Sequence, residues 1–224
     1  MNESQTREVP VIAVDGPGGS GKGTIAIMLA MHLGWHYLDS GALYRLTALA
    51  ALNAGVPHDD ESALGSLAAD LDIHFETDGE NTRAVLAGED VSERIRLDDI
   101  GVLASRISAF PAVRAALSER QRRFRQPPGL VADGRDMGTV IFPDAGLKIY
   151  LTASPGCRAE RRYKQLKDKG ESVNLTRLLR EIKARDSRDQ SRSVAPLRPA
   201  EDAKIIDSTH LSIEEVFAKV VSMI

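Results

Sequence analysis

The sequence lacks the features that mark secreted, zinc-stapled or membrane-spanning proteins. Its 224 residues include a single cysteine, Cys157, so no internal disulfide can form and no second thiol can complete a zinc site. The apolar stretch Ile25–Met31 is far shorter than the roughly 20 residues that a membrane-spanning helix needs. The first residues, Met1–Glu8, are polar and carry no signal-peptide pattern. We therefore expect a cytoplasmic protein that does not enter a membrane.

Neither the charge nor the composition is extreme. The formal net charge of −3 provides no overall basic field, which argues against a nucleic-acid-binding protein. Hydrophobic residues make up 42% and charged residues 27%, ordinary values that exclude a disordered or fibrous chain. The length fits one domain with an insertion, or at most two small domains. Arginine outnumbers lysine by 21 to 8, and arginine suits bidentate phosphate contacts, although genomic base composition explains the same excess.

Short apolar strands alternate with helices along most of the chain. Strands are expected at Val9–Val14, before Asp39, and at Leu130–Ala132, Leu147–Leu151 and Lys204–Ile206. Helices are expected at Lys22–Leu33, Gly41–Asn53, Ser62–Asp70, Ile100–Phe110, Pro111–Arg125, Pro155–Lys169, Leu175–Arg188 and after Ser212. This alternation predicts an α/β fold, a parallel sheet flanked by helices.

One stretch departs from that alternation. Asp72–Thr77 and Thr82–Ala87 read as two short strands around the turn residues Asp78–Asn81, which predicts a hairpin. We interpret this part of the chain, about residues 60–100, as a small β-containing insert in a single domain that spans residues 1–224.

The strongest local signal is a glycine-rich phosphate loop between a predicted strand and a predicted helix. Glycines let successive backbone N–H groups turn inward, and the helix N-terminus adds its positive dipole end. The strict pattern places Ser or Thr directly after the lysine, whereas here Gly23 follows Lys22 and Thr24 comes one residue later. The expected ATP-binding residues of the loop are Gly16, Pro17, Gly18, Gly19, Ser20, Gly21, Lys22, Gly23 and Thr24.

A triphosphate-binding loop does not by itself name the reaction. The Asn-Lys-x-Asp base-reading motif expected of a GTPase is excluded, because no Asn-Lys pair occurs in the chain. A translocating ATPase would be expected to be larger. A nucleotide-binding regulator without turnover and a small-molecule kinase stay open. A kinase needs, in addition, an acceptor site and cations that hold two phosphorylated groups end to end.

Three further segments supply candidates for that second site. Asp39–Arg45 follows the second predicted strand, Asp133–Thr139 follows the third, and Arg185–Arg192 lies late in the chain. In open α/β sheets, ligands bind beyond the carboxyl ends of the strands, where the first two segments fall. On a helix, Arg185, Arg188 and Arg192 would share one face, which is equally typical of a solvated charged surface.

Taken together, these segments resemble the nucleoside monophosphate kinases, and within them the bacterial cytidylate kinases. The Gly-Lys-Gly-Thr ending of the phosphate loop is the variant that these kinases use. Matching segments are Asp-Ser-Gly-Ala-Leu-Tyr-Arg at 39–45, Ala-Asp-Gly-Arg-Asp-Met-Gly-Thr at 132–139, Arg-Asp-x-Arg-Asp at 185–189 and Ile-Ile-Asp-Ser-Thr at 205–209. The resemblance runs from about Val9 to Ile224.

The resemblance implies transfer of the γ-phosphoryl group of ATP to CMP or dCMP, with Mg²⁺ bridging the ATP phosphates. It implies catalytic roles for Lys22, Arg135 and Arg192, and a possible contact of Thr24 with Mg²⁺. It also implies a helical lid at about residues 156–174, in which Arg158, Arg161 and Arg162 close over ATP. The implied CMP-binding residues are Ser40, Arg45, Ser105, Arg114, Arg135, Asp136, Arg185, Asp189 and Arg192.

Chemistry suggests how these residues divide the work. An acid such as Asp136 can accept from the cytosine N4 amino group, and Ser105 or Arg114 can donate to the acceptor edge of the base. Uracil has an oxygen in place of that amino group, so CMP should be preferred to UMP. Arginines at 45, 135 and 192 would clamp the acceptor phosphate, and Arg185 with Asp189 would hold the sugar.

Each assignment has a plainer alternative. Asp136 also fits a turn aspartate, and Ser105 an ordinary serine on a helix surface. Arg45 and Arg114 also fit surface ion pairs, and the lid arginines a solvated helix. The alternative function is a P-loop kinase for another phosphorylated metabolite or pyrimidine nucleotide. The expected partners are ATP and CMP or dCMP, with no nucleic acid and no membrane, and the expected state is a monomer.

Overall fold

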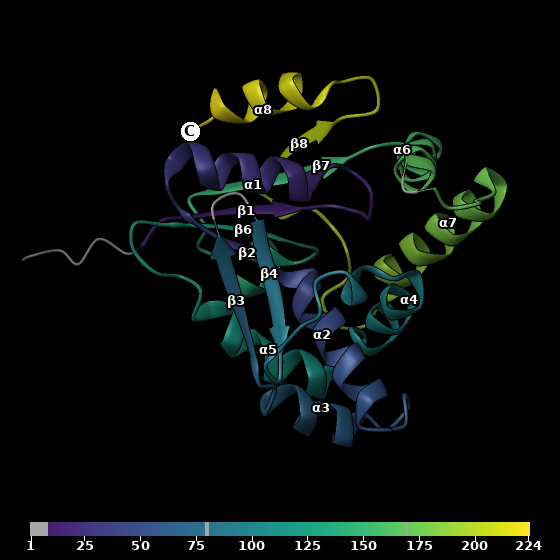
Figure 1. Cartoon of the computed structure of the whole chain (residues 1–224). Coiled ribbons are helices and arrows are strands. Elements are labelled where there is room, and N and C mark those ends of the chain that lie inside the picture. The colour runs from purple at the N-terminus through teal and green to yellow at the C-terminus, as the bar shows by residue number, and fades with distance from the viewer. Residues whose placement is uncertain (1–8, 79–80, 169) are drawn as a thin grey trace, which may run out of the picture. The chain divides into compact units, whose positions relative to one another are not determined.

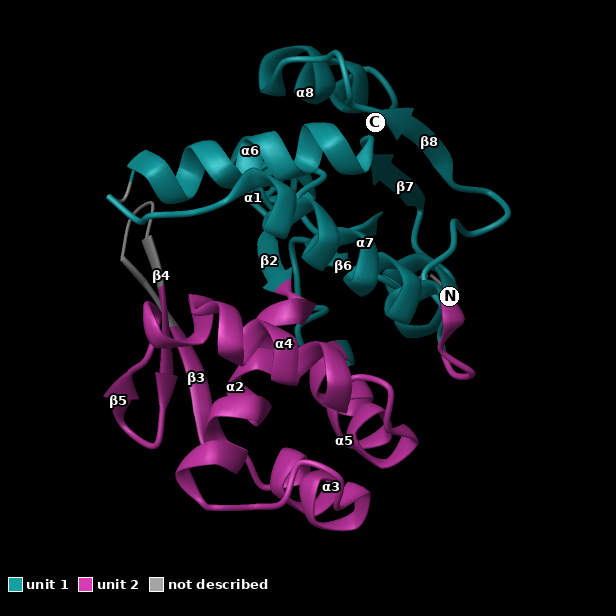
Figure 2. Ribbon diagram, turned by 90° about the vertical axis from the view of Figure 1, so that its right-hand side faces the viewer, with its two compact units in different colours: residues 1–38, 122–190, 195–224 teal, residues 39–121, 191–194 magenta. Residues whose placement is uncertain are grey.

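The computed structural model describes residues 9–78, 81–168 and 170–224. The chain divides into two compact units, shown in different colours in Figure 2. Unit 1 comprises residues 1–38, 122–190 and 195–224, and unit 2 comprises residues 39–121 and 191–194.

A five-stranded sheet forms the centre of unit 1 and confirms the predicted α/β class (Figure 1). Its order is β2-β6-β1-β7-β8, and the pairs β1–β6, β1–β7 and β7–β8 are parallel. The strands β1 and β6 are buried along their whole length, which explains their continuous apolar runs. The bounds are β1 Val11–Asp15, β2 His36–Asp39, β6 Leu130–Gly134, β7 Leu147–Thr152 and β8 Lys204–Asp207.

Four α-helices lie in the described part of unit 1: α1 Lys22–Leu33, α6 Pro155–Asp168, α7 Leu175–Ser191 and α8 Ile213–Val221. The apolar side of α1, including Ile25 and Leu29, packs with residues of β1, β6, β7 and β8 into one core cluster. The helix α8 joins this cluster, and the ring of Phe217 meets His32 of α1 edge to face at 5.7 Å. A capping box between Ser212 and Glu215 begins α8, which confirms the predicted cap at Ser212.

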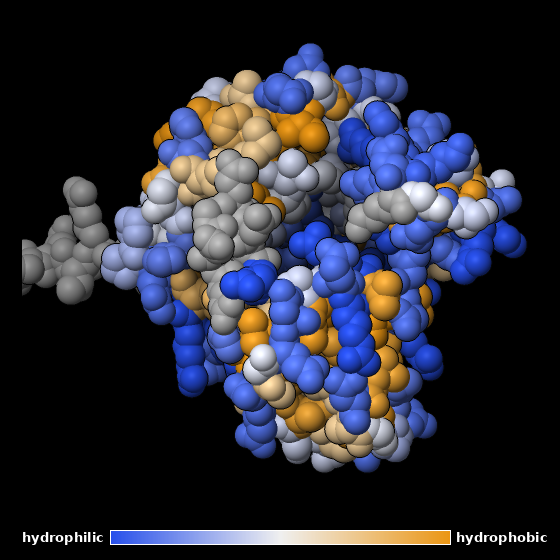
Figure 3. All heavy atoms as spheres, viewed as in Figure 1, coloured by the Kyte–Doolittle hydropathy of each residue, from blue (hydrophilic) through white to orange (hydrophobic). Residues whose placement is uncertain are grey.

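Apolar side chains also remain exposed near this core. Figure 3 shows orange spheres over α1 and α8 in the upper part of the view. Ile27 and Met31 of α1 are 41% and 59% exposed, and Ile213 of α8 is 48% exposed. Among the described helices, no single one is long and apolar enough to span a membrane, and only the pair 98–107 and 111–122, bent by 102°, meets the length and composition requirement together.

Unit 2 combines helices with a small antiparallel sheet. The expected hairpin is present as β3 Ile73–Asp78 paired with β4 Asn81–Leu86, and β5 Glu89–Asp90 adds a third short strand. Residues 79 and 80 of the predicted turn lie outside the described part of the chain. The helices are α2 Ser40–Asn53, α3 Glu61–Ala69, the short 3₁₀ helix η1 Arg94–Arg96, α4 Asp98–Ile107 and α5 Pro111–Arg122.

Three local features differ from the sequence expectation. The helix α5 ends at Arg122 rather than near Arg125, shortly before Pro127–Pro128, which disfavours helical backbone in the residue that precedes it. The helix α7 ends at Ser191, so Arg192 lies beyond it and does not continue a helical face with Arg185 and Arg188. A five-residue π-helix, η2 Met137–Ile141, follows β6 where the sequence predicted no helix.

The two sides of α1 predict a contrast in stability. Leu29→Ala removes a fully buried side chain, so we expect the free energy of unfolding to fall by about 3 kcal/mol. Ile27→Ala on the same helix removes an exposed side chain, and its effect should stay within about 0.5 kcal/mol. Urea unfolding followed by circular dichroism measures both variants, and equal losses would contradict the assignment of this core.

Candidate functional site

The phosphate loop connects β1 to α1, as predicted. Gly16, Gly19 and Gly21 have φ of 154°, 78° and 91°, in the range that favours glycine. A Cβ at Gly16 would lie 2.0 Å from the carbonyl oxygen of Leu151, so only glycine fits there. No side chain caps the first turn of α1. The N-terminus of α1 is therefore available to bind an anion through its backbone N–H groups.

The departure at Gly23 from the strict loop pattern has a steric cause. A Cβ at position 23 would lie 3.0 Å from Oδ2 of Asp133 and 3.9 Å from the hydroxyl of Tyr37. The carboxylate of Asp133, a residue of β6, is buried, and its Oδ1 lies 3.4 Å from Nζ of Lys22. Glycine at position 23 thus leaves room for the carboxylate that pairs with the loop lysine.

Two further cationic side chains lie beside the phosphate loop. A Cβ placed on Gly18 would lie 3.6 Å from Nη2 of Arg135 and 3.7 Å from Nη1 of Arg185. Arg135 donates from Nε to Asp189, which is 4% exposed, at 3.0 Å. Burial disfavours the charge of Arg135, but the carboxylates of Asp189 and Asp133 outweigh it and raise the pKa of this guanidinium. Unit 1 therefore brings together four of the predicted site residues, Gly18, Arg135, Arg185 and Asp189.

The basic helix α6 contacts the same loop through two arginines. Arg158 is 2% exposed and donates to the carbonyl oxygen of Gly18 at 3.0 Å, while its guanidinium forms a two-pronged ion pair with Asp186 of α7. Arg161 donates to Ser208 after β8 and to the carbonyl oxygen of Ser20. Arg162, the other predicted lid arginine, is half-buried on α6. Arg158, predicted to bind ATP, is thus engaged with protein groups in this structure.

Asp136 begins the π-helix η2 and lies close to the end of β1. The structure buries Asp136 to 3% exposure. The backbone N–H groups of the two residues after it, Met137 and Gly138, donate to Oδ1 and Oδ2 of Asp15, each at 2.8 Å. Burial of Asp15 raises the pKa of its carboxyl to about 7, although the two backbone hydrogen bonds act in the opposite direction.

Unit 2 gathers a second set of predicted residues around Ser108. The carbonyl oxygen of Ser108 accepts from Arg114 at 3.2 Å, and its hydroxyl lies 3.3 Å from Nη1 of Arg192. The same hydroxyl donates to the carbonyl oxygen of Ser105 at 3.0 Å. The hydroxyl of Ser105 is buried and has no partner within the described residues, as expected of a group that meets a ligand. The guanidinium of Arg114 lies 5.8 Å from the ring centre of Tyr44.

The remaining two predicted residues of unit 2 lie on α2. Ser40 is buried at the first position of this helix, directly after Asp39, whose side chain caps the helix through the backbone N–H of Ala42. Arg45 donates to the carbonyl oxygens of Ile95 and Leu97 at 2.6 and 3.3 Å. Arg45 thus contacts η1 and the residue at its C-terminal end.

Four residues that bind or order the predicted ones were not singled out from the sequence: Asp15, Asp133, Ser108 and Ser208. Asp133 lay inside a recognised segment, and its position at the end of a buried strand was the signal that could have identified it. Ser208 belonged to the recognised segment 205–209, and its hydroxyl donates to the carbonyl oxygen of Ser20 at 3.1 Å. Ser108 carries no sequence signal, because its partners come from α4, α5 and the segment after α7.

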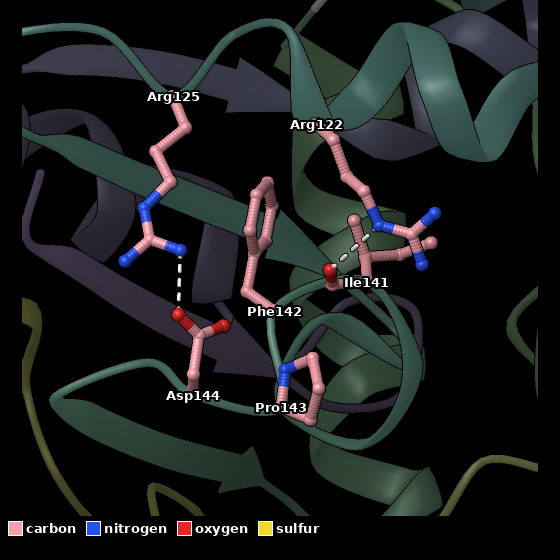
Figure 4. Close-up of a pocket in the computed structure, with 6 residues that line it drawn as sticks. All are labelled: Arg122, Arg125, Ile141, Phe142, Pro143 and Asp144. Carbon is pink, nitrogen blue, oxygen red and sulfur yellow. Dashed lines mark hydrogen bonds and ion pairs between the residues drawn. The ribbon is translucent and has the colours of Figure 1, made fainter. Parts of the chain in front are cut away.

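A surface cavity of about 340 Å³ in unit 1 contains none of the predicted site residues. Figure 4 shows the ring of Phe142 between the side chains of Arg122 and Arg125. Arg125 is paired with Asp144 at 2.6 Å, and this guanidinium holds the pKa of Asp144 below its usual range. Nε of Arg122 donates to the carbonyl oxygen of Ile141 at 3.3 Å. The polar groups of this cavity therefore bind each other.

Within the described residues, no group of three or more His, Cys, Asp or Glu side chains is arranged to hold a metal ion. His32 and His36 are four residues apart, but His32 lies in α1 and His36 begins β2, so they do not share one helical face. The exposed hydroxyl of Thr24 next to the loop lysine suits a cation that is bound mainly by nucleotide phosphates and water.

The contact of Gly23 with Asp133 predicts the effect of a side chain at this position. A Cβ at position 23 would crowd Oδ2 of Asp133, so Gly23→Ala should displace the loop backbone from β6 and raise KM for ATP about fivefold, the effect of about 1 kcal/mol. Gly146→Ala, just before β7 and outside the predicted site, is the matched control, because a Cβ there meets no atom within 4 Å. Steady-state kinetics with varied ATP measures both, and equal KM values in the two variants would refute the steric argument.

The buried carboxyl of Asp15 predicts a pH dependence of stability. Its pKa of about 7 in the folded chain lies above the value of 3.8 expected in the unfolded chain. The folded state therefore binds the proton more tightly, and this contribution to stability is lost as the pH rises from about 4 to 7, by at most about 1.4 kcal/mol for each pH unit. The free energy of unfolding, measured with urea at pH 5 and at pH 8, should fall more between these pH values for the wild type than for Asp15→Asn. Parallel decreases would contradict the raised pKa.

Comparison with known proteins identifies the family. The cytidylate kinase family model matches residues 12–224. The cytidylate kinase of Aeromonas salmonicida is 60% identical over 213 residues, which cover 95% of this chain and 93% of the relative. The cytidylate kinase of Stutzerimonas stutzeri is 59% identical over 218 residues, which cover 96% and 95%. Shikimate kinase from Bacteroides thetaiotaomicron aligns at 12% identity over 96% of both chains with a TM-score of 0.42, too distant a likeness to indicate function. The matched range and the level of identity to these relatives show that the chain belongs to the cytidylate kinase family.

Proposed function

We propose that this protein transfers the γ-phosphoryl group of ATP to CMP or dCMP, giving ADP and CDP or dCDP. Membership of the cytidylate kinase family supports the reaction. The observation that carries the site is the convergence of cations on the phosphate loop, where Lys22 lies in the loop and Arg135 and Arg185 lie beside Gly18. A nucleotide-binding regulator needs only the loop, whereas phosphoryl transfer needs additional positive charge for the transferred group and the acceptor.

The loop and its lysine would bind the donor. Backbone N–H groups at the start of α1 and the Lys22 ammonium face the triphosphate, and Lys22 exchanges its partner Asp133 for phosphate oxygens. The acceptor is a phosphate that is already ionised near neutral pH, so the reaction needs no general base. Catalysis then rests on positioning and on stabilising the charge that spreads over the transferred oxygens.

The acceptor-nucleotide residues are distributed over both units. In unit 1, we assign Arg135 to the acceptor phosphate, Asp136 to the cytosine amino group, and Arg185 with Asp189 to the sugar. Residues of unit 2 would bind the acceptor through the base edge and the phosphate, and these are Ser40, Arg45, Ser105, Arg114 and Arg192. The buried hydroxyl of Ser105, which has no hydrogen-bond partner among the described residues, supports this assignment because it can still bond to a ligand.

Mg²⁺ would accompany ATP rather than reside in the protein. The hydroxyl of Thr24 is the loop group assigned to it, and the phosphates and water would supply most of its oxygen ligands. When bound, the ion neutralises charge on the β- and γ-phosphates. We further propose α6 and the following residues, to about 174, as a lid, and the region of about 60–100 as an insert that helps bind the acceptor. The protein would act in the cytoplasm as a monomer, without nucleic acid or membrane partners.

An ADP-release assay with ATP and Mg²⁺ tests the reaction. CMP, dCMP, UMP, AMP and a sugar acid are offered in parallel, and fast turnover is expected only with CMP and dCMP. Lys22→Met should lower turnover by at least about 100-fold, because it removes the charge that contacts the transferred phosphoryl group. Turnover with another acceptor alone would favour a different small-molecule kinase, and turnover with none would favour a regulator.

The base-reading role of Asp136 has its own test. Asp136→Asn replaces an acceptor of the cytosine amino group with a group that also donates, so kcat/KM for CMP should fall by about 10- to 100-fold and that for UMP far less. Asp144→Asn, which removes an ion pair outside the predicted site, is the control and should change neither value. Equal losses with CMP and UMP would show that Asp136 does not read the base.

A further inference from the structure

Asp15 has no role in the function proposed above, yet its position is unusual. It is the last residue of β1, it immediately precedes the phosphate loop, and it is 4% exposed. Both oxygens of its carboxylate accept from one short segment: Oδ1 accepts from the N–H of Met137 and Oδ2 from the N–H of Gly138. One buried side chain therefore joins the start of the phosphate loop to the segment that follows Asp136.

The segment that Asp15 holds is the first turn of the π-helix η2. The carbonyl oxygen of Asp136 accepts from Val140 at 2.9 Å and from Ile141 at 3.2 Å, which closes the wide turn. The first N–H groups of any helical turn have no partner inside the turn. Asp15 supplies that partner from another strand, and so fixes the direction in which the backbone leaves Asp136. π-helical turns are rare and occur often at functional sites.

Packing also holds the turn in place. The side chain of Met137 is fully buried over Gly134, where a Cβ would lie 2.8 Å from its Cγ and Cε. Gly138 lies against the stem of Lys148, 3.1 Å from the position of a Cβ. These contacts pack the turn against the sheet. Arg122 donates to the carbonyl oxygens of Ile141 and Val140 near the end of the turn. The two hydrogen bonds to Asp15 are the directional contacts at the start of the turn, next to Asp136.

We propose that Asp15 is a positioning residue for acceptor recognition, which fixes the turn after Asp136 so that Asp136 and Arg135 face the acceptor nucleotide in register with the phosphate loop. This inference rests on the acceptor roles proposed above for those two residues. Asp15 is covalently joined to Gly16, so the same residue anchors the loop that binds the donor and the turn that reads the acceptor. In-line transfer requires that the two be held in a fixed relation.

The electrostatics of Asp15 are consistent with a functional rather than a stabilising role. Burial raises the pKa of this carboxyl to about 7, and Asp133 and Asp136 nearby add to the increase. Arg135 and Tyr150 are two further titratable groups that interact electrostatically with Asp15. A carboxyl group is thus kept where burial disfavours its charge, while an apolar residue would leave the two N–H groups unpaired.

Asp15→Asn tests the proposal with little change of shape. The Asn side chain keeps one acceptor oxygen but turns an NH₂ group toward the second backbone N–H, so one hydrogen bond is lost. We expect the ratio of kcat/KM for CMP to that for UMP to fall about tenfold, with KM for ATP changed less than about twofold. Asp144→Asn is again the control and should leave both quantities unchanged. A loss that is equal for CMP, UMP and ATP would indicate a merely structural residue and overturn the proposal.

A double-mutant cycle with Asp136→Asn identifies the route of the effect. If Asp15 acts through Asp136, adding Asp15→Asn to Asp136→Asn should leave the CMP-to-UMP ratio unchanged, whereas an independent effect of each substitution on the ratio would contradict the route. If Asp136→Asn alone leaves the ratio unaltered, the base-reading assignment fails. Asp15 is then judged on KM for CMP against KM for ATP, and a rise in KM for CMP alone would support positioning through Arg135.

Hydrogen–deuterium exchange provides a readout that does not depend on activity. In Asp15→Asn, peptides covering residues 135–141 should exchange at least about tenfold faster than in the wild type, while peptides covering β7 and α8 keep their rates. Unchanged exchange in 135–141 would overturn the proposal even if activity falls. Faster exchange throughout the sheet would show general destabilisation and would also overturn it.

Discussion

The neutralisation of clustered positive charge by buried carboxylates is the interaction on which the rest of unit 1 depends. A loop built to receive a triphosphate concentrates cations, and the structure gives three of them an acidic partner. Lys22 has Asp133, Arg135 has Asp189, and Arg158 has Asp186. Without these partners, cations held close together and partly buried would repel one another and lose hydration.

The acidic partners come from different elements and therefore also define the architecture. Asp133 is the next-to-last residue of β6, and Asp186 and Asp189 lie on α7, so the ion pairs join the central sheet, the loop and two helices. Ser208 adds a neutral link by donating to the loop carbonyl of Ser20 and accepting from Arg161. The loop is thus fixed from β6, from α6 and α7, and from the segment after β8.

Much of this arrangement could be predicted from the sequence, because the signals are local. The strand, loop and helix around Lys22 follow from an apolar run, glycines and a helical pattern. The hairpin follows from two short strands and turn residues. The bounds of α7 and the π-helix after Asp136 could not be predicted. A π-turn has no residue periodicity of its own, and the acceptor for the first N–H groups of η2, Asp15, is far away in the sequence. Ser108 was missed for the same reason, since its partners are brought to it only by folding.

Gly23 has a consequence that reaches beyond this loop. The space that its missing side chain leaves is occupied by the carboxylate of Asp133. The two positions are therefore sterically coupled, and a larger residue at 23 requires the carboxylate or the loop backbone to shift unless a smaller residue stands at 133. The residue type after the loop lysine therefore also constrains the residue type near the end of the neighbouring strand β6. In redesigning such a loop, the residue after the lysine and the residue at 133 on β6 should be exchanged together.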